Sequence, residues 1–333
     1  MSAREREITA PVSLTLRGGR LNPAAIGWAR HPIIETSGVG RGFGRNKRWE
    51  YWNVLTPTHI LALTVSSLDY AAVHEVWVFD RETEQTWHRS ATVLPSRGVT
   101  LAPTLETDSS SARVRELSID IDEVEGGTRL RGEIPGVQFD IVAHLPAGHE
   151  RLAVVVPWSS RRFQYTVKDV ARPAEGTLTI DGTEHRVSPT DAWAVLDHGR
   201  GRWPYDITWN WGAGSGRSHG RVVGVQFGGR WTQGTGSTEN AMYIDGTIHK
   251  ISEELEWHYD LADLMAPWRV IGEGVDATFT PFYNKVTRTN LGVVASSTDQ
   301  CFGAWSGTFA PEAGEPVAFS QIEGWAEHVH NRW

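Results

Sequence analysis

The residues best suited to chemistry in this chain are Asp197, His198 and Arg200, which stand in the run Asp-His-Gly-Arg-Gly. They offer a proton donor, a relay and a charge partner, and Tyr205 follows a few residues later as another group able to tune the acid. The preceding run Ala-Trp-Ala-Val-Leu is typical of a strand, and the two glycines of the motif would allow a sharp turn after it. We therefore expect Asp197 at a strand end. A structural ion pair between Asp197 and Arg200 is the alternative.

Tryptophan is the most over-used residue type, with 16 copies in 333 residues. A buried tryptophan supplies a large apolar wall and one N–H donor. Several such walls around Asp197 would make a pocket for a hydrophobic molecule and would favour the uncharged acid by desolvation. Packing of these rings in a core is the alternative. The residues expected to contact a ligand are Trp193, Trp203, Trp209, Asn210, Trp211, Trp231, Asn240 and Trp305.

A loop of small residues follows at 228–238 and ends in Glu239 and Asn240. Such loops often close a pocket, so Glu239 is a candidate to position water; anchoring of the loop by hydrogen bonds is the alternative. Gly212, Gly214 and Gly216 resemble a phosphate-binding fingerprint. A strand-like run follows them instead of a helix, so we expect no dinucleotide site.

Charge and composition exclude several other classes. The chain has 32 basic and 40 acidic residues, a net charge of −8, and no long basic run, so nucleic acid is not an expected partner. The single cysteine, Cys301, excludes a disulfide framework and is expected in a core. The 13 histidines form no His-Glu-x-x-His pattern, so we expect no metal and no cofactor. No apolar run is long enough to cross a membrane, and we expect a cytoplasmic protein of open oligomeric state.

The chain reads as β-structure almost throughout. Short runs rich in β-branched and aromatic residues alternate with Gly, Asp and Pro turns. The run 113–122 alternates apolar and charged residues as one half-buried strand would, and Asp245-Gly between two apolar runs predicts a hairpin. About 300 residues of antiparallel sheet exceed one ordinary barrel. We therefore expect two packed barrels or sandwiches with little helix, and a seam within 161–176.

Six longer motifs stand out along the chain: Phe163-Gln-Tyr-Thr-Val-Lys168, Val195 to Tyr205, Trp209 to Gly216, Thr235 to Asn240, Gly303-Ala-Trp-Ser-Gly307 and Glu323-Gly-Trp-Ala-Glu327. Together they resemble the DUF2804 family over most of the chain. The run Trp193-Ala-Val-Leu-Asp-His-Gly is also similar, more remotely, to the Trp-x-Asp-His-x-x-Gly signature of carotenoid 1,2-hydratase and AttH-like proteins. Here the spacing before Asp197 is longer, and Gly-Arg-Gly follows in place of an acidic-Trp-Gly continuation.

The resemblance implies two lipocalin-like antiparallel β-domains, which we place at residues 1–170 and 171–333, the second carrying the Asp197 motif. It also implies a hydratase in which Asp197 delivers the proton to an isoprenoid-like alkene. We thus expect a cofactor-independent hydratase, dehydratase or isomerase with a hydrophobic substrate. A lipocalin-like binding protein is the first alternative. Glycoside chemistry by Asp197 and Glu239 is the second, and it requires about 5 to 9.5 Å between the carboxyl groups.

Overall fold

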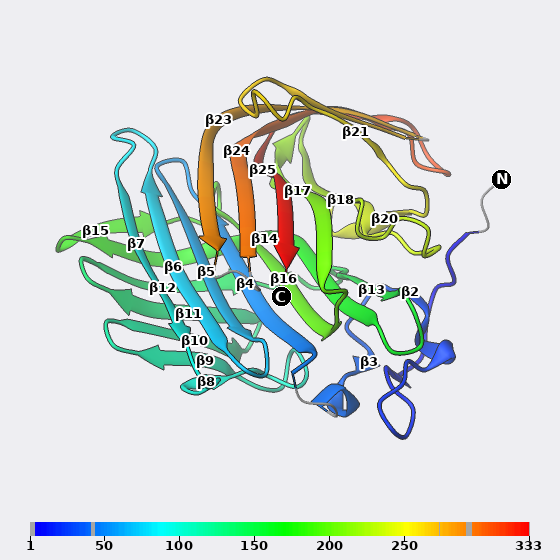
Figure 1. Cartoon of the computed structure of the whole chain (residues 1–333). Helices are drawn as coiled ribbons and strands as arrows, with labels where there is room; N and C mark the ends of the chain where they lie inside the picture. The colour runs from blue at the N-terminus through cyan, green and yellow to red at the C-terminus, as the bar shows by residue number, and fades with distance from the viewer. Residues whose placement is uncertain (1–3, 41–43, 273, 291–294, 333) are drawn as a thin grey trace. The chain divides into compact units, whose positions relative to one another are not determined.

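The computed structural model describes residues 4–40, 44–272, 274–290 and 295–332, which form strands almost throughout (Figure 1). In these residues the helices are two short 3-10 segments, η1 (Pro23–Ala25) and η2 (Ser37–Gly40). The chain forms two compact units. We call Ile8–Trp203 the N-terminal unit, and Met1–Glu7 with Pro204–Trp333 the C-terminal unit. The prediction of an all-β protein with little helix is confirmed.

The N-terminal unit contains a large sheet whose β7, β6, β5 and β4 run side by side (Figure 1). Val78 of β6 and Ile119 of β10 are buried in the same core, so strands from distant parts of the sheet face one another across it. The sheet is therefore curled. Its main order is β7 (Thr86–Val93), β6 (Ala72–Asp80), β5 (His59–Ser67), β4 (Asn46–Leu55), β16 (Trp193–Arg202), β14 (Phe163–Ile180), β12 (Val137–His144), β11 (Gly127–Ile134), β10 (Leu117–Val124), β9 (Ser110–Val114) and β8 (Val99–Thr100).

Shorter strands complete this unit. β13 (Leu152–Pro157) pairs with β14 and with β2 (Gly27–Ala29), and β15 (Thr183–Val187) pairs with β14. β1 (Val12–Ser13) and β3 (Ile34–Glu35) form a separate parallel pair. These elements surround a second apolar cluster that includes Leu14, Val155 and Phe163.

Two sequence predictions differ from the structure in this unit. The run 113–122 is a hairpin and not one strand, because the chain turns at Glu116, which has φ 59°, between β9 and β10. The expected domain boundary at 170/171 falls within β14, whereas the units divide after Trp203. The Arg-Pro-Ala-Glu-Gly signal marks an irregular pairing between Asp169 and Arg172, which leaves β14 continuous.

Among its described residues, the C-terminal unit forms a nine-stranded antiparallel sheet, with β23, β24, β25, β17 and β18 side by side (Figure 1). Asp245-Gly makes the predicted hairpin between β19 and β20. Phe227, Trp268 and Phe279 lie in one core, so this sheet is also curled. Its order is β20 (Thr247–Ile251), β19 (Asn240–Ile244), β18 (Arg221–Gly229), β17 (Asp206–Ser218), β25 (Val317–Arg332), β24 (Ala295–Phe309), β23 (Val275–Asn290), β22 (Trp268–Gly272) and β21 (Glu256–His258).

The glycine series of β17 serves the packing of Trp305. A Cβ on Gly212 would lie 2.5 Å from the Trp305 ring, and one on Gly214 would lie 3.0 Å from it. The Trp305 indole is fully buried in the core of the C-terminal unit. Alternate glycines on one strand face thus make room for one large ring, and Trp305, expected to contact a ligand, packs this core.

Candidate functional site

The Asp-His-Gly-Arg-Gly motif lies inside β16, not in a turn after it. The expectation of a sharp turn is wrong because Gly199 and Gly201 serve close packing. A Cβ on Gly199 would overlap the ring of Trp49, and one on Gly201 would overlap the Gln164 side chain. The glycines are therefore needed for the space they leave beside the strand.

Strand geometry places Asp197 on the opposite face of β16 from His198 and Arg200, because successive side chains alternate. Arg200 forms its ion pair with Glu50 of β4 at 3.3 Å, so the expected pair with Asp197 is not the one formed. A direct Asp197–Arg200 relay is therefore excluded by this geometry, although the residues are close in sequence.

Asp197 is held instead by three donors from neighbouring strands. The Trp49 Nε1–H donates to Oδ2 at 3.0 Å, and the Thr166 hydroxyl donates to Oδ1 at 3.1 Å. The Lys168 ammonium lies 3.1 Å from Oδ1, and both charged side chains are nearly buried. Lys168 is the direct cross-strand neighbour of Asp197. All three contacts place a hydrogen-bond donor or a positive charge against the carboxylate oxygens.

Aromatic rings adjoin this carboxylate. The Trp49 ring packs edge-on against Trp203 with centroids 5.6 Å apart, and Trp203 meets Trp158 at 5.2 Å. The Trp203 Nε1–H donates to Gln164 Oε1 at 2.7 Å. Trp193 shares the Asp197 face of β16 but lies four residues along the strand. Among the tryptophans expected to contact a ligand, Trp203 is thus linked to Asp197 through the ring of Trp49.

A buried charge network occupies the other face of β16. Arg200 donates to the carbonyl groups of Trp49 and Ala102, both at 2.7 Å, and Glu50 accepts from the Ser110 hydroxyl at 2.6 Å. Burial lowers the pKa of Arg200 to about 10, although the Glu50 charge opposes the shift. Burial would raise the pKa of Glu50, but hydrogen bonding and the neighbouring charges hold it below its usual value. These contacts tie several segments together.

His198 belongs to the same network. Burial and the Arg200 charge lower the pKa of His198 to about 4, so the imidazole is neutral at pH 7. Its Nδ1 lies 3.6 Å from Glu50 Oε1, beyond hydrogen-bond distance. The structure therefore gives His198 and Arg200 a scaffolding position behind the strand that carries Asp197.

The remaining predicted site residues belong to the C-terminal unit. The Trp231 Nε1–H donates to Glu239 Oε1 at 2.7 Å, and Asn240 Oδ1 accepts from the Gly228 amide at 2.7 Å. Asn240 also donates to the Glu253 carbonyl at 2.9 Å. These bonds match the loop-anchoring alternative for Glu239 and Asn240.

Two further tryptophans of this unit also make defined contacts. Trp209 Nε1–H donates to Glu327, and Trp211 Nε1–H donates to Gln226, both at 2.9 Å. Asn210 Nδ2 donates to the Tyr259 hydroxyl at 3.0 Å. Tyr205, the other expected partner of Asp197, is 49% exposed.

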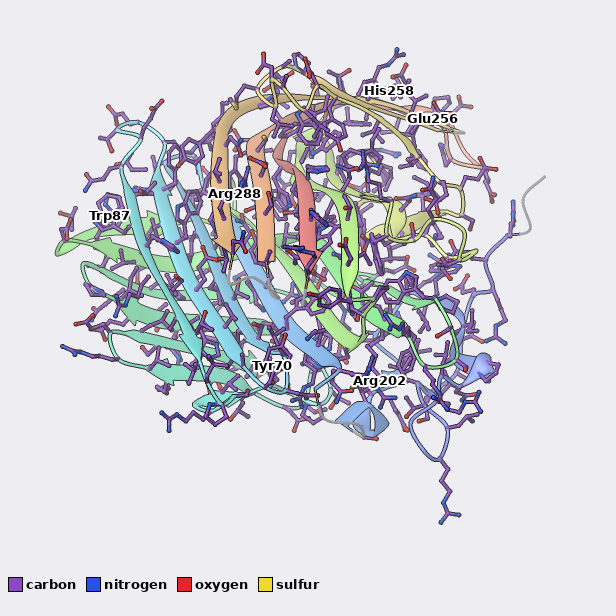
Figure 2. All side chains as sticks on the ribbon, viewed as in Figure 1. Tyr70, Trp87, Arg202, Glu256, His258 and Arg288 are labelled. Atoms are coloured by element: carbon purple, nitrogen blue, oxygen red, sulfur yellow. The ribbon has the colours of Figure 1, made fainter. Side chains whose placement is uncertain are left out.

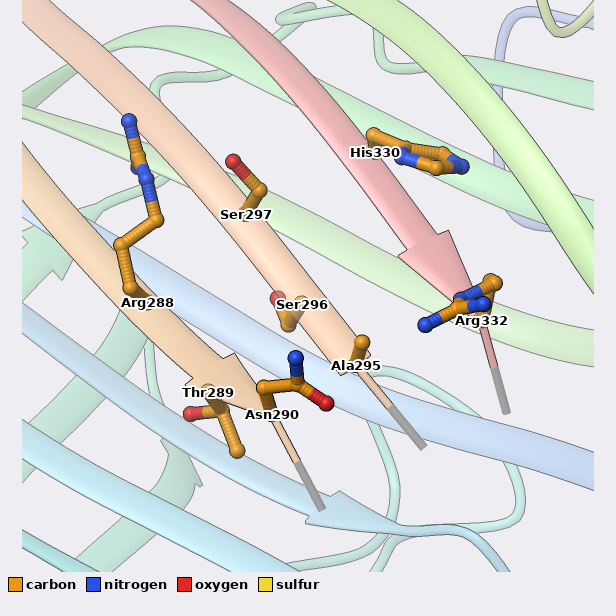
Figure 3. Close-up of a pocket in the computed structure, with 8 residues that line it drawn as sticks. All are labelled: Arg288, Thr289, Asn290, Ala295, Ser296, Ser297, His330 and Arg332. Carbon is orange, nitrogen blue, oxygen red and sulfur yellow. The ribbon is translucent and has the colours of Figure 1, made fainter. Parts of the chain in front are cut away.

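Two cavities lie within single units. One, of about 420 Å³, is lined by Arg288, Ser297 and His330 among others (Figure 3). Figure 2 labels Arg288, whose guanidinium binds Asp299 at 2.6 Å. The other, of about 310 Å³, lies over β10, β11, β12 and β14. Neither lining includes a predicted site residue.

Two absences apply only to the portion of the chain that the structure describes. There, no group of three or more His, Cys, Asp or Glu side chains is arranged to hold a metal ion. Within the same residues, no helix is long and apolar enough to cross a membrane.

The two curled antiparallel sheets define a lipocalin-like all-β class, shared with solved structures. Kievitone hydratase from Nectria haematococca matches with a TM-score of 0.51 and 12% identity over 90% of this chain and 95% of that chain. CghA with Sch210972 matches with a TM-score of 0.52 and 13% identity over 87% and 88%. A putative AttH protein from Nitrosomonas europaea gives 0.47 and 12% over 86% and 92%.

In sequence, no protein with a curated description matches this chain. The chain belongs to the DUF2804 family, a domain of unknown function, which matches residues 5–333. The family predicted from the sequence motifs is thereby confirmed.

Proposed function

We propose that this protein is a cofactor-independent acid–base enzyme that adds or removes water, or moves a double bond, in a hydrophobic substrate. The observation that carries the proposal is the nearly buried Asp197 carboxylate, 3.1 Å from Lys168, on a sheet face that it shares with Trp49 of the neighbouring strand β4. A titratable pair in such surroundings is an arrangement suited to proton transfer. Kievitone hydratase, which shares the fold, is named for water chemistry, and this adds support.

In the proposed reaction, Asp197 carries the proton. Lys168 first passes a proton from its ammonium to the carboxylate, which leaves a neutral amine and a neutral acid. Exclusion of water by an apolar substrate makes this neutral pair less unfavourable relative to the ion pair. Asp197 then protonates one carbon of a C=C bond, water adds to the other carbon, and the proton lost by that water returns to Asp197. Dehydration is the reverse.

The aromatic residues would stabilise the cationic intermediate. Trp49 and Trp203 lie beside the proton carrier, and an aromatic face attracts a nearby positive charge. The proposal gives His198 and Arg200 the task of fixing β4 against β16 through Glu50. Contact of Trp209, Trp211 and Trp231 with the substrate remains a prediction, as do the roles of Tyr205 and Glu239.

A binding protein without chemistry is the second candidate. It is favoured by the saturation of Asp197, whose two oxygens already accept from Trp49 and Thr166 and face Lys168. A structural ion pair needs no further role. Ligand that quenches tryptophan fluorescence and is recovered unchanged would support this candidate.

The glycoside alternative gains no support from the contacts of its two carboxylates. Asp197 belongs to the N-terminal unit and Glu239 to the C-terminal unit, so neither unit by itself contains the required pair. Glu239 already accepts from Trp231.

The proposal is tested with Asp197→Asn, which keeps the shape of the side chain. The wild-type protein is incubated with a panel of unsaturated isoprenoid alcohols, and products that gain or lose one water are measured by mass spectrometry. We expect Asp197→Asn to lose at least about 100-fold in rate, the scale of general acid catalysis. Asp206→Asn, an exposed strand residue, is the matched control and should react like wild type. Equal activity in Asp197→Asn would refute the mechanism.

A further inference from the structure

Gln164 of β14 lies on the same face of the sheet as Asp197 of β16 and is fully buried. In the register of β14 and β16, Lys168 pairs with Asp197, Thr166 with Gly199, and Gln164 with Gly201. Gly201 is four residues from Asp197, so their Cα atoms are about 13 Å apart along the strand. The side chain of Gln164 therefore marks a second position on the proposed catalytic face.

The orientation of the Gln164 amide is determined by chemistry. Trp203 Nε1–H can only donate, so the atom it meets at 2.7 Å must be the amide oxygen. The amide nitrogen, Nε2, is then a donor that points elsewhere. The absence of a Cβ on Gly201 provides the space in which this side chain lies.

The Gln164 Nε2 group is buried and has no hydrogen-bond partner in the described structure. An unpaired buried donor costs about 1 to 3 kcal/mol, and native proteins rarely retain one without a reason. Gln164 is held in place by Trp203, so it cannot turn to relieve the cost without losing that bond. A donor fixed in this way is ready to receive an acceptor atom.

We propose that Gln164 Nε2 binds an acceptor oxygen of the substrate. This inference rests on the proposed function at Asp197 and defines the substrate class more closely. The substrate would be an apolar, unsaturated molecule that carries a carbonyl, ether or hydroxyl oxygen remote from the reacting carbon, because Gly201 and Asp197 are about 13 Å apart along the strand. A pure hydrocarbon would leave the donor unpaired and would bind less well.

The test compares two probes of similar size by tryptophan fluorescence quenching. Geranylacetone has a ketone oxygen that only accepts, and β-farnesene is a hydrocarbon. We expect wild type to bind geranylacetone at least about tenfold more tightly, the equivalent of 1.4 kcal/mol. Gln164→Glu keeps an acceptor for Trp203 but removes the amide donor, so it should lose this preference. Gln138→Glu, an exposed residue on β12, is the control and should keep the preference.

The result separates this inference from the function on which it rests. Asp197→Asn should lose turnover yet keep the preference for geranylacetone. Loss of preference in Gln164→Glu together with undiminished turnover in Asp197→Asn would retain the binding role and refute the proposed reaction. Equal binding of both probes by wild type, binding of neither, or an unchanged preference in Gln164→Glu would overturn the inference and assign the donor to an ordered water.

Discussion

Asp197 and Lys168 form an ion pair in which both charged groups are largely removed from water. Their side chains are 12% and 6% exposed, and Thr166 and Trp49 add the hydrogen bonds that a buried carboxylate needs. Such a pair gains little over apolar packing, but removal of one member leaves the other charge uncompensated. The pair is therefore retained at some cost, which fits a role in proton transfer.

Lys168→Met should destabilise the protein by about 3 kcal/mol, because it leaves the Asp197 charge buried without its counter-ion. The double variant Lys168→Met/Asp197→Asn should recover most of that loss, as measured by urea unfolding. Arg269→Met, which breaks the exposed pair with Asp276, is the control and should change stability little. A double variant whose loss equals the sum of the single losses would show that the pair is not coupled.

Sequence reasoning could identify Asp197 but not its partners. Lys168 is 29 positions away in the chain and meets Asp197 only through the pairing of β14 with β16. His198 and Arg200 were assigned to Asp197 because they are neighbours in sequence. Recognition of 197–201 as a strand would have placed them on the opposite face by alternation alone.

At the scale of elements, β16 shows why the glycine-rich motif was misread. Glycine usually marks turns, so the sequence predicted a loop after Leu196. In the structure, the lack of a side chain at Gly199 leaves space for the Trp49 ring, and the lack of one at Gly201 leaves space for Gln164. The local pattern around Asp245-Gly identified the hairpin of β19 and β20. The glycines of β16 depend instead on side chains from other strands, which no local pattern reveals.

Gly199→Ala should displace the Trp49 ring and break its hydrogen bond to Asp197, because the added methyl group would overlap the indole. We expect a loss of about 1 to 3 kcal/mol, the usual cost of overpacking. Thermal unfolding and near-ultraviolet circular dichroism would measure it. Gly216→Ala, where the nearest atom to a Cβ is 3.3 Å away, is the milder control. An unperturbed Trp49 signal in Gly199→Ala would contradict this packing account.

At the scale of the whole molecule, the chain divides into units that its sequence order does not predict. Glu5, near the chain start, belongs with the C-terminal unit, where its carboxylate pairs with buried Lys250 and accepts from the Thr238 hydroxyl at 3.0 Å. The two-sheet fold class could be predicted from strand content and family motifs. The boundary after Trp203 could not, because β14 continues through the turn signal that marked the expected seam.

Stability should fall as the pH is lowered from about 6.5 to 4. Burial lowers the pKa values of His74 and His198 to about 4. In that interval the unfolded chain binds protons that the folded chain does not, so protonation favours unfolding. Above pH 6.5 these two residues should not contribute to the change of unfolding free energy with pH. Urea unfolding at several pH values would measure the effect.

His74→Leu should flatten the dependence of stability on pH. Both nitrogens of the buried His74 ring lack a hydrogen-bond partner in the described structure, so the substitution removes no hydrogen bond from the folded protein. A leucine there keeps an apolar side chain beside Val65 and removes one of the two titrating groups. His31→Leu, at an exposed position, should leave the slope unchanged. The same slope in His74→Leu as in wild type would contradict the assignment.

The central claim is that Asp197 moves a proton to and from substrate carbon, and deuterium transfer tests it most directly. Unsaturated isoprenoid alcohols are incubated with the protein in D₂O, and the recovered substrate and product are examined by mass spectrometry. Hydration, dehydration and isomerisation all place solvent deuterium on carbon when they proceed by reversible protonation. We predict carbon-bound deuterium with wild type and Asp206→Asn, and none above background with Asp197→Asn. No incorporation by wild type, or equal incorporation by Asp197→Asn, would contradict the account.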